Sequence, residues 1–289
     1  MRALIDYDVI TYLVGFASEH STFKVYLRGT EAEFGAVCVC KSMKEVRQFI
    51  ADNQDYYWVK DIQPEPLAYC LHSVKITIQS ILEAVGATSY TGFLTGKQQF
   101  REQVATIKPY KGNRDPFHKP VHYDNIKKYL IDQWNAEVVD YYEADDALAM
   151  AQWEDYKTSW EETSPPKLNT ILCTIDKDLD QVPGWHYHFR QKEKYWVSKQ
   201  EATRFFYEQL LSGDPTDNIQ GIPGVGAITA KKILKDCVTE EQLWNAVKQK
   251  YVEYYKNEEV AMDIITETAK LVYMVKEKGV EWCVPTFPL

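Results

Sequence analysis

The first two thirds of the chain alternate short apolar runs with amphipathic stretches. The run that ends at Asp6 (MRALID) and the run at 170–175 (TILCTI) are mostly apolar over the length of a strand. Such runs are typical of strands buried on both faces of a parallel sheet. Helix-like periodicity separates them, as in βαβ folds. We therefore predict an α/β fold over residues 1–190, with a doubly wound, mostly parallel sheet flanked by helices, and a helical region over 191–289.

A segment between about residues 22 and 70 departs from this alternation. Three stretches in it have strand character (FKVYLR, GAVCVC and YYWV), and one helix is expected around 44–52. Its residues show no clear chemistry. We therefore interpret this segment as an insertion on the sheet.

Carboxylates gather where predicted strands end or the next helix begins. These acids are Asp6, Glu143, Asp145, Asp146, Asp176 and Asp178. The carboxyl ends of parallel strands are where α/β proteins place their sites. Each group alone has a simpler explanation, as a partner of a helix dipole or as part of a solvated loop. Together they would repel strongly unless cations neutralised them, so the sequence predicts a Mg²⁺ or Mn²⁺ site with oxygen ligands.

The stretch from Ser212 to Leu234 joins a further pair of carboxylates to a glycine-rich turn. Asp214 and Asp217 are three residues apart. On a helical turn they would project the same way, toward one cation. The alternative is that Asp217 caps the amides that follow it.

The glycine-rich turn opens a predicted helix, AITAKKIL. Its glycines are Gly221, Gly224 and Gly226. Glycines allow positive φ and close approach, and the first helical turn offers unpaired N–H groups to a phosphate. Ile228, Ile233 and Leu234 are expected to be able to face a core, whereas Lys231 and Lys232 are expected to be exposed. Such a turn alone is usually a plain helix connection; its place after the acid pair favours a grip on a nucleic-acid backbone.

Charge is segregated along the chain. A net charge of -9 ordinarily argues against nucleic-acid binding. Residues 97–128, however, carry eight Lys or Arg against three acids. Within them, KPYKGNRDPFHKP interleaves Tyr110 and Phe117 with cations, which suits stacking on an unpaired base while phosphates are held. Proline and glycine predict a crossing segment rather than core; a solvated loop is the alternative.

The cysteine content and the length of the apolar runs bear on the expected cellular location of the protein. Six cysteines are scattered without zinc spacing, which is typical of reduced thiols in a cytosolic protein. The sequence shows no long apolar run and no signal-peptide pattern. We expect a monomer without membrane contact in the cytoplasm, or in the host cytoplasm if the chain is viral.

The order of these motifs resembles a known family. LID at Asp6, PYKGNR, EADD, TIDKDLDQ and GDPTDNIQGIPGVG are similar to the 5′-nuclease family, in particular bacteriophage 5′-to-3′ exonucleases and flap endonucleases. The resemblance extends from residue 1 to about residue 235. It implies a PIN-like nuclease domain, an arch-like segment at about 97–128, and a helix-three-turn-helix unit at 212–235 that grips duplex DNA.

The resemblance also implies a role for each matching residue. Two divalent ions would be held by Asp6, Glu143, Asp145, Asp146, Asp176, Asp178, Asp214 and Asp217. Lys111 and Arg114, with Lys108 nearby, would act on the scissile phosphate, and Tyr110 would stack on a terminal base. The duplex backbone would be bound, with help from a K⁺ ion, by Gly221, Gly224, Gly226, Lys231 and Lys232.

One position departs from the family pattern. An aspartate is usual at the end of the second strand, where this chain has Thr95 and Gly96. The site could compensate through the Thr95 hydroxyl and a water, or bind one metal ion less tightly. The metal set is therefore expected to be one acid short.

The implied function is metal-dependent hydrolysis of DNA phosphodiester bonds at a 5′ end or 5′ flap, in phage-type replication or DNA degradation, with RNA–DNA hybrids as a further substrate class. Two alternatives stay open. A structure-specific DNA-binding protein without catalysis would tolerate the missing acid. A PIN-like endoribonuclease would share the acids but would have no need of the glycine turn.

Overall fold

The computed structural model describes residues 1–29, 35–51, 55–114, 119–162 and 167–287. The chain forms two compact units. The first comprises residues 1–9, 78–118 and 130–289, and the second comprises residues 10–77 and 119–129. Three helices contribute residues to both units: α1 (Tyr7–Ala17), α3 (Leu67–Val85) and α5 (Tyr123–Trp134).

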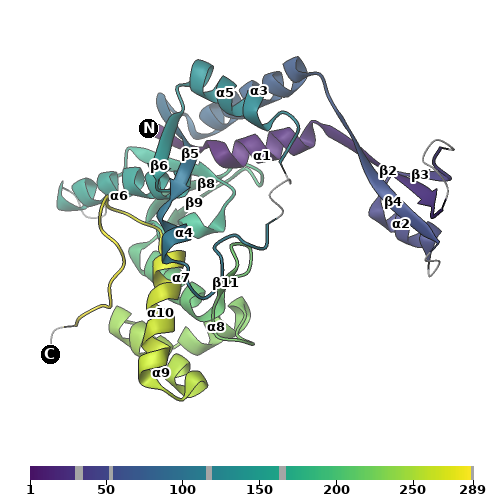
Figure 1. The fold of residues 1–289 in the computed structure, drawn as a ribbon. Coiled ribbons are helices and arrows are strands. Elements are labelled where there is room, and N and C mark those ends of the chain that lie inside the picture. Colours follow the sequence, from purple (N-terminus) through teal and green to yellow (C-terminus); the bar gives the residue numbers. More distant parts are fainter. Residues whose placement is uncertain (30–34, 52–54, 115–118, 163–166, 288–289) are drawn as a thin grey trace. The chain divides into compact units, whose positions relative to one another are not determined.

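A six-stranded sheet is the centre of the first unit (Figure 1). Its strands in spatial order are β6 (Glu137–Tyr141), β5 (Ser89–Gln99), β1 (Arg2–Asp6), β7 (Thr170–Thr174), β8 (Gly184–His188) and β9 (Glu193–Val197). All neighbouring strands are parallel except β8 and β9. Every residue of β7 and the last four of β1 are buried, as the apolar runs predicted. The predicted α/β class is confirmed.

Short connections carry the chain from the strands of this sheet into the elements that hold the acids. Helix α4 (Phe100–Val104) follows β5, and α6 (Ala144–Glu162) begins shortly after β6. The 3₁₀ helix η2 (Lys177–Gln181) follows β7. Leu148 of α6 packs in one buried cluster with Leu4 and Leu172 of the sheet. This packing fixes the start of α6 against the carboxyl ends of the strands.

A helical region completes the first unit. It contains α7 (Lys199–Ser212), α8 (Ala227–Leu234), α9 (Glu240–Tyr255) and α10 (Glu258–Val272), with the short strands β10 (Gly213–Asp214) and β11 (Ile219–Gln220) between α7 and α8. Ser198 and Thr239 start α7 and α9 through capping boxes, which satisfy amides at the helix ends. Tyr207 and Tyr251 are fully buried in the shared core of these helices.

Buried hydrogen bonds join this helical region to the sheet side. The Gln181 side chain, in η2, donates to the Val272 carbonyl oxygen (2.7 Å) and accepts from the Met274 amide (3.0 Å). Residues on both sides of position 190, where the sequence predicts a division, thus belong to the same compact unit. Among the described residues, no helix combines the length and the apolar character needed to cross a membrane.

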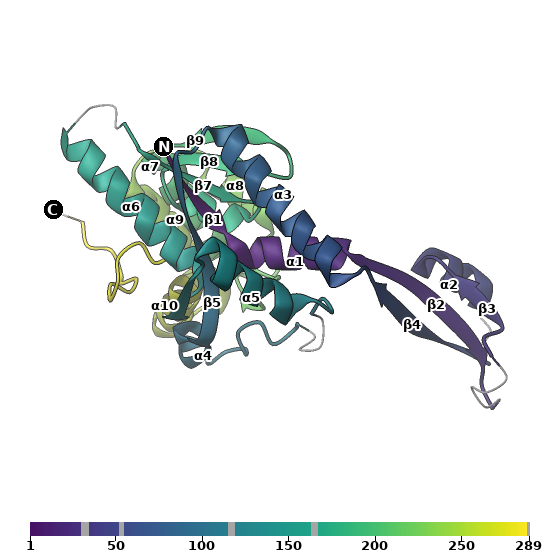
Figure 2. The same ribbon diagram turned by 90° about the horizontal axis from the view of Figure 1, so that it is seen from above.

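The second unit contains the segment that was interpreted as an insertion. Strands β2 (Glu19–Leu27), β3 (Cys38–Cys40) and β4 (Tyr56–Pro64) form an antiparallel sheet of their own, with α2 (Met43–Ile50) packed on it (Figure 2). Phe23, Val25, Cys40 and Val46 are its buried core. The helix around 44–52 and the three stretches of strand character are therefore present, in a sheet separate from the parallel one.

Helix α8 is present at 227–234, as its sequence predicted. The prediction that Ile228 faces the core is wrong, because its side chain is 74% exposed. Leu234 is buried as expected, together with Ala230, and Lys231 and Lys232 are exposed as expected. An exposed isoleucine beside the glycine turn leaves this end of α8 open to a partner.

Candidate active site

Asp6 lies at the carboxyl end of the central strand β1 and is 1% exposed. The Val9 amide donates to its Oδ1 (2.9 Å), so Asp6 caps the first turn of α1. The Thr174 hydroxyl, at the end of β7, donates to its Oδ2 (2.8 Å). The Asp6 carboxylate is therefore held between the ends of two neighbouring strands.

The second group of acids lies at the start of α6, as the sequence predicted. Asp145 and Asp146 belong to the first turn, and Glu143 comes directly before the helix. Acids at this end of a helix also interact favourably with its dipole. Asp146 is fully buried and accepts from the Glu143 amide (3.1 Å), which caps the helix.

Asp176 and Asp178 follow β7 in a tight turn. Asp176 caps η2 by accepting from the Asp178 amide (2.8 Å), and Asp178 accepts from the Gln209 side chain of α7 (2.8 Å). The chain turns into a 3₁₀ helix directly after β7, so the two acids are not alternating residues of an extended strand. Their orientation is set by capping and by α7.

Asp214 and Asp217 lie in the hairpin that joins β10 to β11. The Asp214 carboxylate accepts from the Thr216 amide (2.8 Å), and Asn218 has a positive φ of 61° at the end of the turn. The prediction that the pair shares a helical turn is therefore wrong. A tight hairpin presents the two acids, and asparagine is a residue type that tolerates such a φ.

The buried acids of the strand ends affect one another electrostatically. Burial raises the pKa of Asp6 to about 7, and the charges of Asp8 and Asp176 add to this shift. Burial raises the pKa of Asp178 to about 8, and the charges of Asp176 and Asp214 act in the same direction. Carboxylates from β1, η2 and the hairpin therefore lie within interaction range of one another.

Asp145 connects α6 to the same group. Burial raises its pKa well above the ordinary value, and Asp6 and Asp176 raise it further. Burial also raises the pKa of Asp176, where Asp217 and Asp214 contribute. The acids that are distant in sequence are thus brought together at one edge of the sheet.

This set of side chains fits hard divalent cations in its chemistry. The donors are carboxylate oxygens, the ligands that Mg²⁺ and Mn²⁺ prefer, and a bound cation would relieve the repulsion that raises their pKa values. Within the described ranges, no three acidic, histidine or cysteine side chains already stand as a preformed metal shell. The site has the charge for metal binding, and the carboxylates would have to turn toward the ion.

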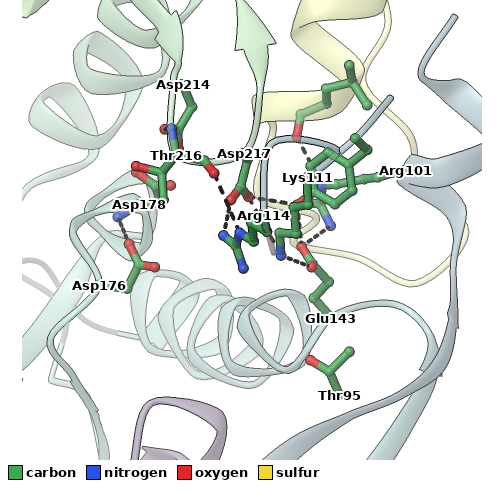
Figure 3. Close-up of polar contacts among 12 residues, drawn as sticks. Thr95, Arg101, Lys111, Arg114, Glu143, Asp176, Asp178, Asp214, Thr216 and Asp217 are labelled. Atoms are coloured by element: carbon green, nitrogen blue, oxygen red, sulfur yellow. Dashed lines mark hydrogen bonds and ion pairs between the residues drawn. The ribbon is translucent and has the colours of Figure 1, made fainter. Parts of the chain in front are cut away.

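The basic segment places its cations directly on these acids (Figure 3). Lys111 Nζ forms an ion pair with Glu143 Oε1 and lies 3.7 Å from Asp217 Oδ2. Arg114 forms an ion pair with Asp217 Oδ1. The Tyr110 hydroxyl is within hydrogen-bond distance of Glu143 Oε2 (2.8 Å) and Asp217 Oδ2 (2.9 Å).

These contacts change the charge state of one acid. Although burial acts to raise it, the pKa of Glu143 lies below its ordinary value because Lys111 and Arg101 stabilise the carboxylate. Glu143 is therefore ionised at neutral pH. In Figure 3, the Arg114 side chain lies between Glu143 on one side and Asp176 and Asp178 on the other.

The basic segment is also fixed to the hairpin through its backbone. The Lys111 amide, where φ is 55°, donates to the Asp217 carbonyl oxygen (2.8 Å). The Asn113 side chain donates to the Pro215 carbonyl oxygen (2.8 Å), and the Asn218 side chain donates back to the Pro109 carbonyl oxygen (2.8 Å). The two motifs that sequence analysis treated separately form one surface.

Arg101 is a residue of the site that sequence reasoning missed, because it was counted only among the basic residues. It is 3% exposed. Its guanidinium donates to both Asp146 oxygens (2.6 and 2.8 Å) and to Glu143 (3.2 Å), and also to the carbonyl oxygens of Leu271 (3.0 Å) and Tyr273 (2.9 Å). Only its position directly after the apolar residue Phe100 could have indicated burial.

The glycine turn borders a cavity of about 540 Å³, whose lining includes Lys108, Gly224 and Gly226. Gly224 has a φ of 83°, as a glycine turn requires. Gly226 starts α8 without a side-chain cap, so the first amides of α8 have no side-chain acceptor there. A Cβ at Gly221 would lie 2.3 Å from the Gly213 nitrogen, so this glycine serves the packing of the β10–β11 hairpin.

Thr95 stands where the family pattern has an acid. Its hydroxyl accepts from the Ala144 amide at the start of α6 (2.9 Å), and its own amide donates to Asp8 Oδ2 (2.9 Å). Gly96 approaches the Asp140 side chain so closely that a Cβ there would lie 2.0 Å from Asp140 Oδ1. The end of β5 therefore contacts two acids from other elements.

The solved structures that this chain resembles share its fold. The bacteriophage T5 5′-exonuclease with bound zinc is 19% identical, with a TM-score of 0.53, over 95% of this chain and 90% of that chain. A T5 flap endonuclease in a complex with DNA and metal ions is 18% identical, with a TM-score of 0.53, over 95% and 91%. A third T5 structure, crystallised with metal ions, has a TM-score of 0.56 at 16% identity, over 95% and 89%. The predicted resemblance is confirmed for the fold.

Sequence comparison finds partial relatives. DNA polymerase I of Bacillus subtilis is 28% identical over 171 residues, which is 54% of this chain. The thermostable DNA polymerase I of Thermus aquaticus is 31% identical over 110 residues, 35% of this chain. The matches span only 18% and 12% of the lengths of these polymerases. No protein-family model matches the chain.

Proposed function

We propose that this protein is a metal-dependent 5′-nuclease that hydrolyses phosphodiester bonds of DNA at a 5′ end or 5′ flap. The observation that carries the proposal is the joining of two features in one place. Acids from four elements lie within interaction range of one another, and Lys111 and Arg114 are fixed against the same group. The relatives and solved structures named above, which are nucleases and polymerases, support it.

Seven of the predicted acids are suited to hold two divalent ions, either Mg²⁺ or Mn²⁺. They are Asp6, Glu143, Asp145, Asp176, Asp178, Asp214 and Asp217. Bound ions of this kind activate a water and stabilise the leaving oxygen in phosphodiester hydrolysis. The eighth predicted ligand, Asp146, directs both oxygens to Arg101. We therefore assign Asp146 to holding Arg101 and the start of α6 in place.

Lys111 and Arg114 would exchange partners when substrate binds. In this structure they neutralise Glu143 and Asp217. With divalent ions bound at those carboxylates, Lys111 and Arg114 would be free to bind the scissile phosphate and to stabilise the charge that grows on it. The Tyr110 hydroxyl lies within hydrogen-bond distance of the same two acids, so we assign it to bracing them at rest. Stacking on a terminal base would require its hydroxyl to release both acids.

The glycine turn and α8 would bind the duplex at a fixed distance from this site. The uncapped amides at the start of α8, together with exposed Lys231 and Lys232, suit phosphate oxygens. Gly224 leaves the turn open to close approach, and the turn would bind a phosphate with help from a K⁺ ion. Lys108 lines the same cavity and would contact the strand between the two sites. We extend the proposal to RNA–DNA hybrids and to a monomeric enzyme.

The function is tested by incubating the purified protein with 5′-labelled duplex, 5′-flap and RNA–DNA hybrid substrates, with Mg²⁺, with Mn²⁺ or with EDTA. We expect cleavage products that carry a 5′ phosphate, formed only with a divalent ion. Binding to the same substrates in EDTA is measured by gel shift in parallel. A preparation of Asp176→Asn, purified in the same way, controls for contaminating nucleases.

The possible outcomes separate the three functions considered. Duplex binding without cleavage under any of these conditions would favour the DNA-binding protein without catalysis. Cleavage of single-stranded RNA, with no activity on the 5′-end and flap DNA substrates, would favour the endoribonuclease. Metal-dependent release of 5′ products from DNA supports the 5′-nuclease.

A further inference from the structure

The strand end at Thr95 has no acid of its own, but a carboxylate from another element reaches it. Asp8 belongs to the first turn of α1, two residues after Asp6. Its Oδ2 accepts the Thr95 amide at 2.9 Å. The Asp8 carboxylate is therefore positioned at the end of β5, next to the residue that stands where an acid is expected.

Asp8 also lies within electrostatic range of Asp6, one of the acids already placed in the site. Burial is the main cause of the raised pKa of Asp6, and the negative charge of Asp8 adds to it. Thr95 has no carboxylate of its own. Its hydroxyl accepts a hydrogen bond from the Ala144 amide (2.9 Å), directly before Asp145. Thr95 thus contacts Asp8 on one side and the start of α6 on the other.

A simpler role for Asp8 would be that of an acid in the first turn of a helix, where it interacts with the dipole. Asp6 already caps this helix through the Val9 amide. A second carboxylate beside a buried one adds repulsion, and any acid whose side chain pointed to solvent would serve the dipole without that cost. A residue that only interacted with the helix dipole would not need the contact that Asp8 makes with the end of β5.

We propose that Asp8 supplies the carboxylate that the end of β5 lacks, as a ligand of a divalent ion together with Asp6 and Asp145. This inference rests on the proposed function, because it concerns the same metal site. An acid two residues beyond the end of β1 would replace one at the end of the adjacent strand, so the donor set keeps its negative charge. Thr95 then orients Asp8 through its amide, and metal binding does not depend on its hydroxyl.

The inference is tested by metal binding to the whole chain without substrate, using Mn²⁺ as the probe and electron paramagnetic resonance or calorimetry as the readout. We expect wild type to bind two Mn²⁺ ions, and Asp8→Asn to lose one ion or at least about 10-fold in its affinity. Asparagine keeps an oxygen for the Thr95 amide. Circular dichroism and thermal unfolding check the fold of each variant.

Asp140 offers a matched control at the same strand end. Its Oδ1 accepts the Lys97 amide (3.0 Å), as Asp8 accepts that of Thr95, but Asp140 is exposed. Asp140→Asn should leave both ions in place. A rescue variant returns the acid to the strand: Asp8→Asn combined with Thr95→Asp should bind two Mn²⁺ ions again, including where Asp8→Asn alone folds poorly.

Each outcome bears on a different claim. If wild type binds no Mn²⁺, the metal-dependent function itself fails and the role of Asp8 fails with it. If wild type and Asp8→Asn bind two ions with equal affinity, the role of Asp8 is overturned while the proposed function stands. Failure of Thr95→Asp to restore the ion lost in Asp8→Asn would also overturn it, since the two positions would then serve different purposes.

Discussion

The acidic site has two sides that differ in how the protein neutralises them. On one side, Glu143, Asp146 and Asp217 form ion pairs with Arg101, Lys111 and Arg114. On the other side, no ion pair within the described part of the chain reaches the acids Asp6, Asp145, Asp176 and Asp178. Figure 3 shows Asp176 and Asp178 apart from the lysine and arginine side chains that contact Glu143.

The pKa values follow this division. The cations Lys111 and Arg101 outweigh burial and lower the pKa of Glu143, whereas burial and mutual repulsion raise the pKa of Asp6 to about 7 and that of Asp178 to about 8. On the side of Glu143, the protein's own cations therefore neutralise the acids. The other side is poised to take up protons or metal ions, which would compete for the same oxygens.

The strongest test of this division is activity after a change on the unpaired side. Asp176→Asn keeps an oxygen to cap η2, so the fold should persist, but it removes a negative charge from the proposed metal set. We expect cleavage to fall by more than the roughly 10–100-fold that is typical of changes to residues that only orient metal ligands. Duplex binding measured in EDTA should be unchanged. Single-turnover cleavage and a gel shift on the same 5′-flap substrate measure the two quantities.

A matched control for Asp176→Asn is available in the same turn. Asp180 of η2 accepts instead from the Tyr195 hydroxyl of β9 (2.8 Å). Asp180→Asn should therefore retain wild-type cleavage within a few-fold. Equal losses of cleavage in the two variants, or loss of duplex binding in Asp176→Asn, would show that these acids serve folding.

The paired side is tested by stability. Arg101→Met leaves Asp146 buried without its cation, and we expect the free energy of unfolding to fall by about 3–5 kcal/mol, as is usual when one partner of a buried pair is removed. Urea unfolding in EDTA measures the change. Adding Asp146→Asn to Arg101→Met should recover part of the loss, because the unpaired charge is then gone.

An exposed ion pair supplies the comparison for Arg101. Lys157 pairs with Glu277 (3.1 Å) at the protein surface, where such pairs contribute about 0–1 kcal/mol. Lys157→Met should therefore change stability much less than Arg101→Met. An equally small loss in Arg101→Met would contradict this, because it would mean that the buried ion pair contributes no more to stability than an exposed one.

The sequence predicted the strands that carry the candidate acids better than it predicted how those acids are held. Apolar runs indicated β1 and β7 and therefore the position of Asp6, since strand burial follows directly from composition. The periodicity of regular helices and strands does not extend to the turns after the strands. Asp178 lies in a 3₁₀ helix and Asp217 in a hairpin, because local capping hydrogen bonds set the conformation of those turns.

Other features could not be predicted because they depend on long-range contacts. Arg101 contacts Asp146 across 45 residues and the Leu271 carbonyl across 170, and an isolated arginine gives no sign of such partners. The contact of Asp8 with Thr95 spans 87 residues. The resemblance to the 5′-nuclease family indicated the missing acid at Thr95, but only the folded chain shows which carboxylates lie beside it.

The smallest expected effect concerns how stability depends on pH without metal ions. The pKa of Asp178 in the folded protein, about 8, lies above its ordinary value of 3.8. Between these values the folded state binds more protons than the unfolded state, so stability falls as the pH rises from about 4 to about 8. One such carboxyl contributes at most about 1.4 kcal/mol per pH unit. Asp178→Asn should therefore weaken the decline between pH 5 and pH 8, measured by urea unfolding in EDTA.

Glu253 provides the control for this titration, because its pKa is shifted the other way. Hydrogen bonds from Lys250 and Gln249 lower the pKa of Glu253 below its ordinary value of 4.5, so its contribution is present at higher pH and is lost only as the pH falls below that range. Glu253→Gln should leave the slope between pH 5 and pH 8 unchanged.

Saturating Mg²⁺ should stabilise wild type more at pH 8 than at pH 5, since protons then compete less for the carboxylates. An equal gain from Mg²⁺ at both pH values would contradict the division into a paired and an unpaired side, because metal binding would then not involve the acids that titrate in this range.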